Sequence, residues 1–240
     1  MEINQFLIVL AAFLTSALSA CVGIGGGSLL LALMATLLPI SVVIPLHGIA
    51  QTFSNIGKAY FGRTQIVWQL TKPFLFGTVI GTAVGLLVWS FIPLNINQML
   101  LGLFLLISTW KPEWLRLNKI KLWISGAISS VISVFAGATG PIIMSMLPIK
   151  ELLPSQIVAT HGAIMTLHHS VKTLGFVLIG FSMSNYLPMI TGMLIASWCG
   201  SYIGNKMLIK LPENRVKGSI KLILTLLAFH MILKELLLLL

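Results

Sequence analysis

Apolar runs of about 20 residues follow one another along this chain, with few charged residues between them, and a helix of that length crosses a bilayer core of about 30 Å. Charged residues make up 8% of the 240 residues, whereas soluble domains carry about 25%, so the chain cannot cover a surface that faces water. We therefore expect an all-α integral membrane protein without a soluble domain, embedded in the lipid bilayer.

The apolar runs separate into ten segments, and the connections between them carry helix breakers such as Pro39, Pro93 and Pro212. The segments divide into five and five, which directs attention to an internal repeat. In chain order they cover about 3–22, 26–38, 42–62, 72–92, 97–110, 121–136, 139–149, 154–181, 185–206 and 215–238.

An internal repeat emerges when the sequence is displaced by 114 residues, because 23–62 then aligns with 137–176 without a gap. Histidine and lysine are scarce in so apolar a chain, so their coincidence at one offset is a stronger signal than matches between apolar residues. We expect two equivalent halves of five segments each. The matched pairs are Gly23 with Gly137, Gly26 with Gly140, Ser41 with Ser155, His47 with His161, Gly48 with Gly162, Thr52 with Thr166 and Lys58 with Lys172.

The basic residues indicate that the two halves have opposite orientations in the membrane. Connection 63–72 carries Arg63 and Lys72, whereas its counterpart 177–188 carries no charge. The difference is reversed at the next connection, since 92–97 is uncharged and its counterpart holds four basic residues. Basic connections lie on the cytoplasmic side, so the pattern predicts an inverted repeat with both termini outside. The predicted boundaries are 1–110 for the first half, 111–120 for a cytoplasmic connection and 121–240 for the second half.

Glycine-rich stretches precede the two shortest segments. At 1.5 Å per residue these segments are about 20 and 16 Å long, too short for the hydrocarbon core, so we expect a helix break inside the membrane before each one. A helix that starts at such a break presents unpaired N–H groups and the positive end of its dipole, which together bind anions. The alternative is that the glycines only allow close helix packing, which we favour for Gly77, Gly81 and Gly85. The candidate anion-binding residues at the breaks are Gly25, Gly26, Gly27 and Ser28 in the first half, and Thr139 and Gly140 in the second.

Polar and ionisable residues lie on one face of the segment that follows each break. His47, Gln51, Asn55 and Lys58 are separated by four, four and three residues, which keeps them on one side of a helix. Ionisable residues inside membrane helices usually face the bundle interior and mark a pathway. Two alternatives stay open: the histidines are hydrogen-bonded packing residues, or Lys58 extends to the cytoplasmic surface. The candidates in the second half are His161, His169 and Lys172.

The predicted centre is electropositive, because two helix N-termini and two lysines meet there. The chain has no Asp, and its five Glu residues lie at the chain ends or in polar connections, so an anion is the expected occupant. The two cysteines lie in apolar segments, and we expect no metal and no cofactor. The net charge of +10 reflects loop orientation and lipid headgroups, and we expect no nucleic-acid partner.

Two stretches resemble a known family. VGIGGGSLLLALMATLLP at 22–39 and HGIAQTFSNIGKAYFGR at 47–63, with the second His-Gly pair at His161, resemble the sulfite exporter TauE/SafE family, also called the 4-toluene sulfonate uptake permease family. The resemblance covers essentially the whole chain. It implies a multi-pass carrier of sulfur-containing anions in the cytoplasmic (inner) membrane of a bacterium or archaeon. The family's glycine signature falls on Gly23, Gly25, Gly26 and Gly27, with a weaker copy at Gly137 and Gly140.

The leading hypothesis is an exporter that moves a small oxyanion such as sulfite or an organosulfonate by alternating access of the two halves, driven by the membrane potential. Proton coupling through a histidine is left open, because histidine titrates near neutral pH. An intramembrane enzyme acting on a lipid phosphate is a second hypothesis, but its histidine would need an orienting carboxylate. A membrane interaction subunit is a third, although it would not need buried lysine and histidine. A carboxylate as the transported anion and a homo-oligomer also stay open.

Overall fold

The computed structural model describes residues 3–22, 25–115, 120–148, 151–207 and 213–239. Every regular element in these ranges is a helix, which confirms the all-α class. The Lys58 side chain lies outside the described part of the chain. So do the side chains of residues 20–22, 57, 61, 154, 205–207, 213–217 and 238–239.

The described α-helices of the first half correspond one by one to the predicted segments. Short 3-10 helices, η1 at Arg63–Gln65 and η2 at Pro112–Leu115, lie in the connections after the third and fifth of them. The α-helices are α1 at Ile3–Val22, α2 at Gly26–Leu37, α3 at Ile40–Phe61, α4 at Trp68–Trp89 and α5 at Leu94–Trp110.

The second half follows the same order with one marked difference in length. The helix after the second glycine stretch has 7 residues, fewer than the 11 of the predicted segment 139–149. It ends because Leu147 is extended, with φ −73° and ψ 142°, as the residue before a proline prefers to be. The elements are α6 at Leu122–Ala136, α7 at Gly140–Met146, α8 at Pro154–Leu178, η4 at Ser184–Tyr186, α9 at Leu187–Met207 and α10 at Glu213–Leu239.

Both glycine stretches interrupt helices, as predicted. α1 ends at Val22 and α2 begins at Gly26, while α6 ends at Ala136 and α7 begins at Gly140. The residues that turn the chain have positive φ angles, 98° at Gly25 and 68° at Gly137, which side chains with a Cβ rarely tolerate. The predicted short helix after each glycine stretch is therefore confirmed.

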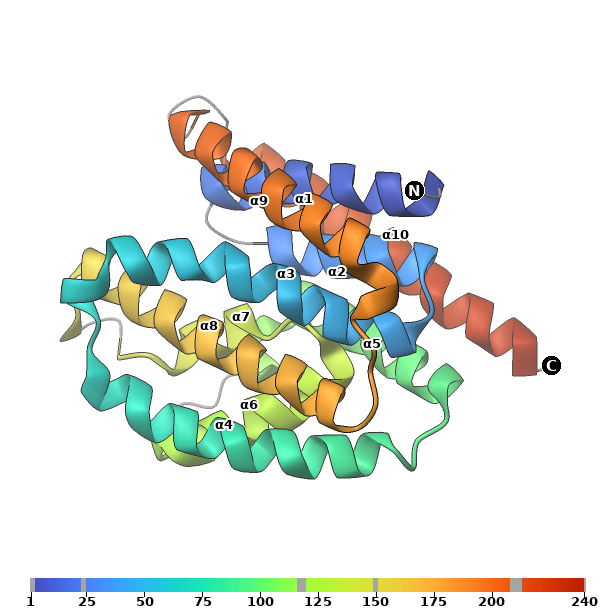
Figure 1. Cartoon of the computed structure of the whole chain (residues 1–240), viewed down its shortest axis with the longest axis horizontal. Coiled ribbons are helices and arrows are strands. Elements are labelled where there is room, and N and C mark those ends of the chain that lie inside the picture. Colours follow the sequence, from blue (N-terminus) through green and yellow to red (C-terminus); the bar gives the residue numbers. More distant parts are fainter. Residues whose placement is uncertain (1–2, 23–24, 116–119, 149–150, 208–212, 240) are drawn as a thin grey trace.

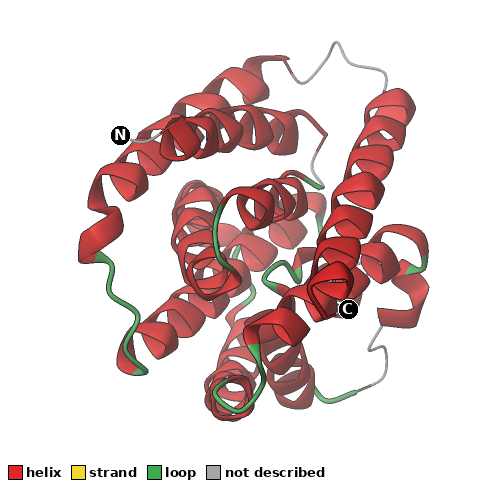
Figure 2. Cartoon of the chain, turned by 90° about the vertical axis from the view of Figure 1, so that its right-hand side faces the viewer, coloured by secondary structure: helices red, strands yellow, loops and turns green. Residues whose placement is uncertain are grey.

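The helices form three layers (Figure 1). α1 and α9 lie together on one side, α3 and α8 cross the middle, and α4 and α6 lie together on the opposite side. α2 packs between α1, α3 and α10, and its Leu30, Leu31 and Met34 are at most 2% exposed, so it occupies the centre of the largest apolar core. Turned by 90°, the molecule is seen to consist of helices joined by short connections wherever the chain is described (Figure 2).

The main contacts join helices of one half to helices of the other. α1 packs on α9, and α6, the repeat equivalent of α1, packs on α4, the repeat equivalent of α9. α3 packs on its own equivalent α8, and α5 packs on its own equivalent α10. Exchanging the two halves therefore reproduces the main helix pairs, which agrees with the predicted repeat. Its inverted orientation in a membrane stays a prediction, as do the domain boundaries.

Glycines allow the close contact between α4 and α6. A Cβ on Gly77 would overlap the backbone of Trp123, and a Cβ on Gly81 would overlap the backbone of Ala127. In the equivalent pair, a Cβ on Gly200 of α9 would overlap the backbone of α1. Small residues let helix backbones approach one another in membranes, so the packing role predicted for the α4 glycines is confirmed.

Apolar side chains cover much of the outer surface. Phe76 and Leu87 of α4 are each 63% exposed, and Trp198 of α9 is 61% exposed. By length and composition, two described stretches are sufficient on their own to cross a membrane, Trp68–Trp89 and Ser184–Gly204. An apolar surface of this kind is suited to lipid rather than to water.

Candidate functional site

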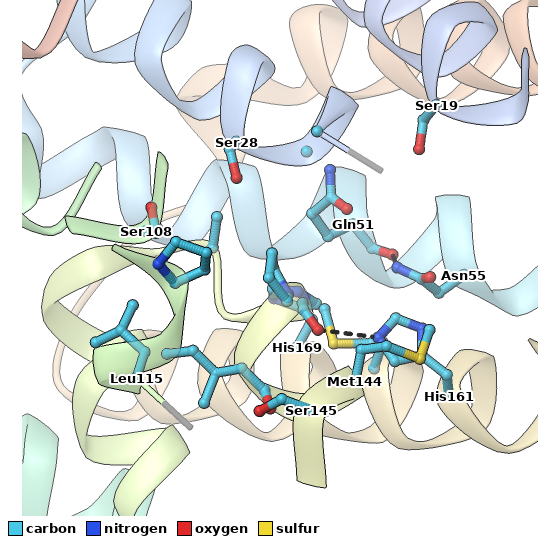
Figure 3. Close-up of a pocket in the computed structure, with 18 of the residues that line it drawn as sticks. Ser19, Ser28, Gln51, Asn55, Ser108, Leu115, Met144, Ser145, His161 and His169 are labelled. Carbon is cyan, nitrogen blue, oxygen red and sulfur yellow. Dashed lines mark hydrogen bonds between the residues drawn. The ribbon is translucent and has the colours of Figure 1, made fainter. Parts of the chain in front are cut away.

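A cavity of about 260 Å³ lies between the two glycine breaks and the helices that follow them (Figure 3). Small-molecule pockets are usually about 300–1,000 Å³, so this one suits a ligand of few atoms. Both halves contribute to its wall. The lining residues are Ser19, Gly25, Gly27, Ser28, His47, Gln51, Asn55, Ser108, Pro112, Leu115, Ala138, Gly140, Pro141, Ile142, Met144, Ser145, His161, Met165 and His169.

The N-terminus of α2 forms one wall. The first bond within this helix runs from the Leu29 N–H to the Gly25 carbonyl, 2.9 Å long, so the N–H groups of Gly26, Gly27 and Ser28 precede it. Gly27 and Ser28 line the cavity, with the Ser28 hydroxyl beside this helix start (Figure 3). These groups and the positive end of the helix dipole favour an anion at this wall.

Gln51 faces the same wall from α3. A Cβ placed on Gly27 would lie 3.0 Å from the Gln51 side-chain oxygen and 3.2 Å from its nitrogen. The lack of a side chain at Gly27 thus lets the Gln51 amide sit next to the first turn of α2. Gln51 and Asn55 are one helical turn apart and both line the cavity (Figure 3).

Two repeat-equivalent histidines hold the two breaks. His47 Nε2 lies 2.9 Å from the Gly27 carbonyl oxygen, and His161 Nε2 lies 3.2 Å from the Gly140 carbonyl oxygen. A carbonyl only accepts, so in each ring Nε2 carries the proton and donates. Each histidine therefore fixes the first turn of a short helix while its ring forms part of the cavity wall.

His169 differs from the other histidines of the cavity. It is fully buried, and among the described residues neither of its ring nitrogens has a hydrogen-bond partner. Its ring lies at the cavity wall, 5.9 Å from the His47 ring in an edge-to-face arrangement. A buried polar group without a partner is costly, so two such nitrogens beside a cavity indicate a place where a ligand supplies the hydrogen bonds.

Lys172 lies behind the cavity wall and does not line it. Its Nζ donates to the Gly137 carbonyl over 2.8 Å and to the Ser133 hydroxyl over 3.1 Å. The side chain is 1% exposed. The predicted direct contact between Lys172 and an anion is therefore absent from the geometry, because the lysine binds the end of α6 instead.

Thr139 also faces away from the cavity. Its hydroxyl lies 3.2 Å from His168 Nε2, and the Ser130 hydroxyl lies 3.1 Å from His168 Nδ1. His168, which is 1% exposed, thus links α6 to the residue that precedes α7.

The structure brings most of the predicted site residues together and leaves some apart. Gly26 is buried against α1, where a Cβ would lie 2.6 Å from the Ser19 Cβ, and it does not line the cavity. Thr139 and Lys172 bind other parts of the protein, and the Lys58 side chain lies outside the described residues. The residues gathered at the cavity as predicted are Gly25, Gly27, Ser28, His47, Gln51, Asn55, Gly140, His161 and His169.

Several lining residues were not predicted. Ser19 lies in α1 at the repeat position equivalent to Ser133, so extending the repeat alignment would have found it. Ser108 and Leu115 come from α5 and η2, and no sequence pattern placed these two elements at the cavity. Met144 and Ser145 lie on α7 and face the cavity opposite α3 (Figure 3).

The described carboxylates lie away from the cavity. Glu235, which was expected at a chain end, lies near the C-terminal end of α10 and is 7% exposed. It does not line the cavity, and no Asp, Glu, Lys or Arg is among the described residues that do. The hydrogen-bonding groups at the wall are therefore amides, hydroxyls and imidazoles together with a helix start.

The chain matches the model of the sulfite exporter TauE/SafE family over residues 8–231. The protein belongs to this family. TauE/SafE proteins are membrane transporters, so the membrane location expected from the apolar segments is supported, and the resemblance seen in the glycine-rich and His-Gly stretches is confirmed. No curated protein and no solved structure matches the chain.

Proposed function

We propose that this TauE/SafE protein exports a small sulfur-containing oxyanion, such as sulfite or an organosulfonate, and binds it in the cavity between α2, α3, α7 and α8. The observation that carries the proposal is the start of α2 at the cavity wall, where the Ser28 hydroxyl and the Gln51 amide add donors and no carboxylate is among the described lining residues. We expect the protein in the cytoplasmic membrane of a bacterium or archaeon.

The donors at the wall favour an anion over a cation. The start of α2, the Ser28 hydroxyl and the Gln51 amide can donate to several oxygens at once. A cation would find no carboxylate among the described lining residues to replace its hydration shell. Leu115, Ile142 and Met165 also line the cavity, and their apolar side chains can contact a short organic group on the anion.

Alternating access of the two halves is the proposed mechanism by which the anion crosses the membrane. The main helix pairs are reproduced when the halves are interchanged, and the cavity lies between the two breaks. In inverted-repeat transporters the two halves move against each other around a substrate bound between them. Outward movement of one negative charge gains about 2.3 kcal/mol per 100 mV of membrane potential, which suffices to drive export.

Anion binding can be tested by thermal stabilisation of the purified protein with sulfite, methanesulfonate, acetate and phosphate. We expect the sulfur oxyanions to raise the melting temperature most. Gln51→Leu should weaken their binding roughly tenfold, because hydrogen bonds to charged groups contribute about 1.5–3 kcal/mol. Gln65→Leu, a change of the same type at an exposed residue of η1, is the matched control and should bind normally.

Transport can be tested in reconstituted vesicles loaded with sulfite under an imposed potential. Efflux should become faster as the inside is made more negative. Efflux that does not respond to the potential would contradict the uniport mechanism, and an absence of efflux together with an absence of stabilisation by any oxyanion would contradict the proposed function.

A further inference from the structure

Residues separated by the repeat offset of 114 meet at the cavity. His47 and His161 are such a pair, and each donates to a glycine carbonyl at its own break. Asn55 and His169 are another pair, and both line the cavity with polar side chains. The two halves therefore supply equivalent positions to one site, and their chemistry can be compared position by position.

Two other equivalent pairs at the cavity differ in polarity. Gln51 of α3 corresponds to Met165 of α8, and Ser28 of α2 corresponds to Ile142 of α7. All four residues line the cavity. Met165 and Ile142 are 5% and 2% exposed, so both are packed into the protein. The first half thus supplies hydrogen-bonding groups at positions where the second half supplies hydrocarbon.

The starts of the two short helices differ in the same sense. Gly27 of α2 corresponds to Pro141 of α7, and proline has no N–H to donate. The Ser145 hydroxyl of α7 is engaged within its own helix, because it donates to the Ile142 carbonyl over 2.7 Å. The start of α7 therefore offers a ligand fewer donors than the start of α2.

The polar and apolar groups lie on different sides of the cavity (Figure 3). Ser28 and Gln51 lie on one side, and Leu115 and Met144 lie on the other. His169 lies between the two sides. A ligand that touches both sides would meet donors at one end and hydrocarbon at the other.

The cavity is larger than the smallest proposed substrate. At about 30 Å³ for each water in the liquid, a volume of about 260 Å³ corresponds to roughly nine water-sized groups. Sulfite consists of one sulfur and three oxygens, so it would leave roughly half of this volume unfilled. A short apolar group attached to the oxyanion would fill the rest and would remove the hydrocarbon of Met165, Ile142 and Leu115 from water.

We propose that the cavity selects an oxyanion that carries a short apolar group over an inorganic oxyanion, and that it binds this ligand in one orientation. The oxyanion lies against the start of α2 and the Gln51 amide, and the apolar group lies against Met165 and Ile142. Met165 is thus a specificity-determining residue. The inference rests on the proposed function, because it requires the cavity to be the anion site.

A series of alkanesulfonates tests the apolar side while the charged head stays constant. Isothermal titration calorimetry on the purified protein measures the dissociation constants of methane-, ethane-, propane- and butanesulfonate. Each additional buried methylene should tighten binding roughly fourfold, so propanesulfonate should bind roughly fifteenfold more tightly than methanesulfonate. At slightly acidic pH, where sulfite also carries mostly one charge, sulfite should bind more weakly than propanesulfonate. 1-Propanol, which has the tail without the oxyanion, should not bind detectably at the same concentrations.

Variants separate the apolar side from the polar side. Met165→Gln introduces the residue of the equivalent position in the first half and should reduce the preference for propanesulfonate over methanesulfonate to about twofold. Met165→Leu keeps hydrocarbon at this position and should keep most of the preference. Gln51→Leu should weaken all four sulfonates by a similar factor, because they share the head. Met183→Gln, the same change at a half-buried methionine that does not line the cavity, is the matched control and should leave the preference unchanged.

The inference is overturned if affinity does not increase from methane- to butanesulfonate, or if Met165→Gln leaves the increase intact. The series in the unchanged chain decides the question if Met165→Gln does not fold. If sulfite and methanesulfonate bind and longer tails bring no gain, the proposed function stands and the apolar subsite fails. If no oxyanion binds, the proposed function itself fails.

Discussion

Two adjacent buried histidines should respond to the same substitution with opposite changes in stability. His168 and His169 are 1% and 0% exposed, yet His168 bonds two hydroxyls while neither ring nitrogen of His169 has a partner among the described residues. Phenylalanine is close to histidine in shape and has no polar ring atoms. Replacing each in turn therefore isolates the contribution of hydrogen bonding at nearly constant packing.

The expected magnitudes follow from the cost of unsatisfied polar groups. A buried donor or acceptor without a partner costs about 1–3 kcal/mol. His169→Phe removes two such atoms but inserts a slightly larger ring, so we expect the free energy of unfolding to rise by about 1–3 kcal/mol. His168→Phe leaves the hydroxyls of Ser130 and Thr139 without their partner and should lower it by about 2–4 kcal/mol.

Thermal unfolding in detergent measures both changes. At about 2–4 °C per kcal/mol for a chain of this size, His169→Phe should raise the melting temperature by about 2–12 °C, and His168→Phe should lower it. His169→Phe should also weaken sulfite binding at least about tenfold, because a ligand loses a hydrogen bond to its charged group. If His169→Phe is more stable but no longer transports, then His169 serves ligand binding at the expense of stability.

A lower melting temperature for His169→Phe would refute the reasoning, since it would mean that the ring nitrogens are already satisfied in the protein. Unchanged sulfite binding in that variant would remove His169 from the site. If the two variants lose stability equally, burial alone explains both histidines.

Other expectations follow from single contacts. Gly81→Leu should prevent stable folding, because the new side chain would overlap the Ala127 backbone. Gly218→Leu on α10 should unfold at nearly the normal temperature, because nothing lies within 4 Å of an added Cβ there. Size-exclusion profiles and melting curves compare the two variants, and equal behaviour would contradict the α4–α6 packing. Gly25→Ala should lower the free energy of unfolding by about 1–2 kcal/mol, because alanine disfavours the φ of 98° at this position. It should also reduce sulfite efflux, because the start of α2 is displaced. A melting temperature equal to that of the unchanged protein would show that the turn is not needed.

The sequence by itself determined the helices and their breaks. Hydropathy and proline placed all ten segments, since the length of an apolar run and the position of a breaker are local properties. The two glycine stretches interrupt the chain because consecutive glycines weaken a helix and tolerate positive φ, as at Gly25 and Gly137. The repeat offset also grouped His47 with His161 before any contact was known, and both hold a break.

The tertiary structure alone decided which of the grouped polar residues reach the cavity. Helical spacing puts His169 and Lys172 on one side of α8, but it does not say which neighbour lies opposite each of them. In the folded chain α6 packs against α8, and the Lys172 side chain meets the Gly137 carbonyl while His169 lies at the cavity wall. The sequence also did not predict which helices pack together across the halves, such as α1 with α9 and α4 with α6. Helix contacts depend on complementary surfaces from distant segments.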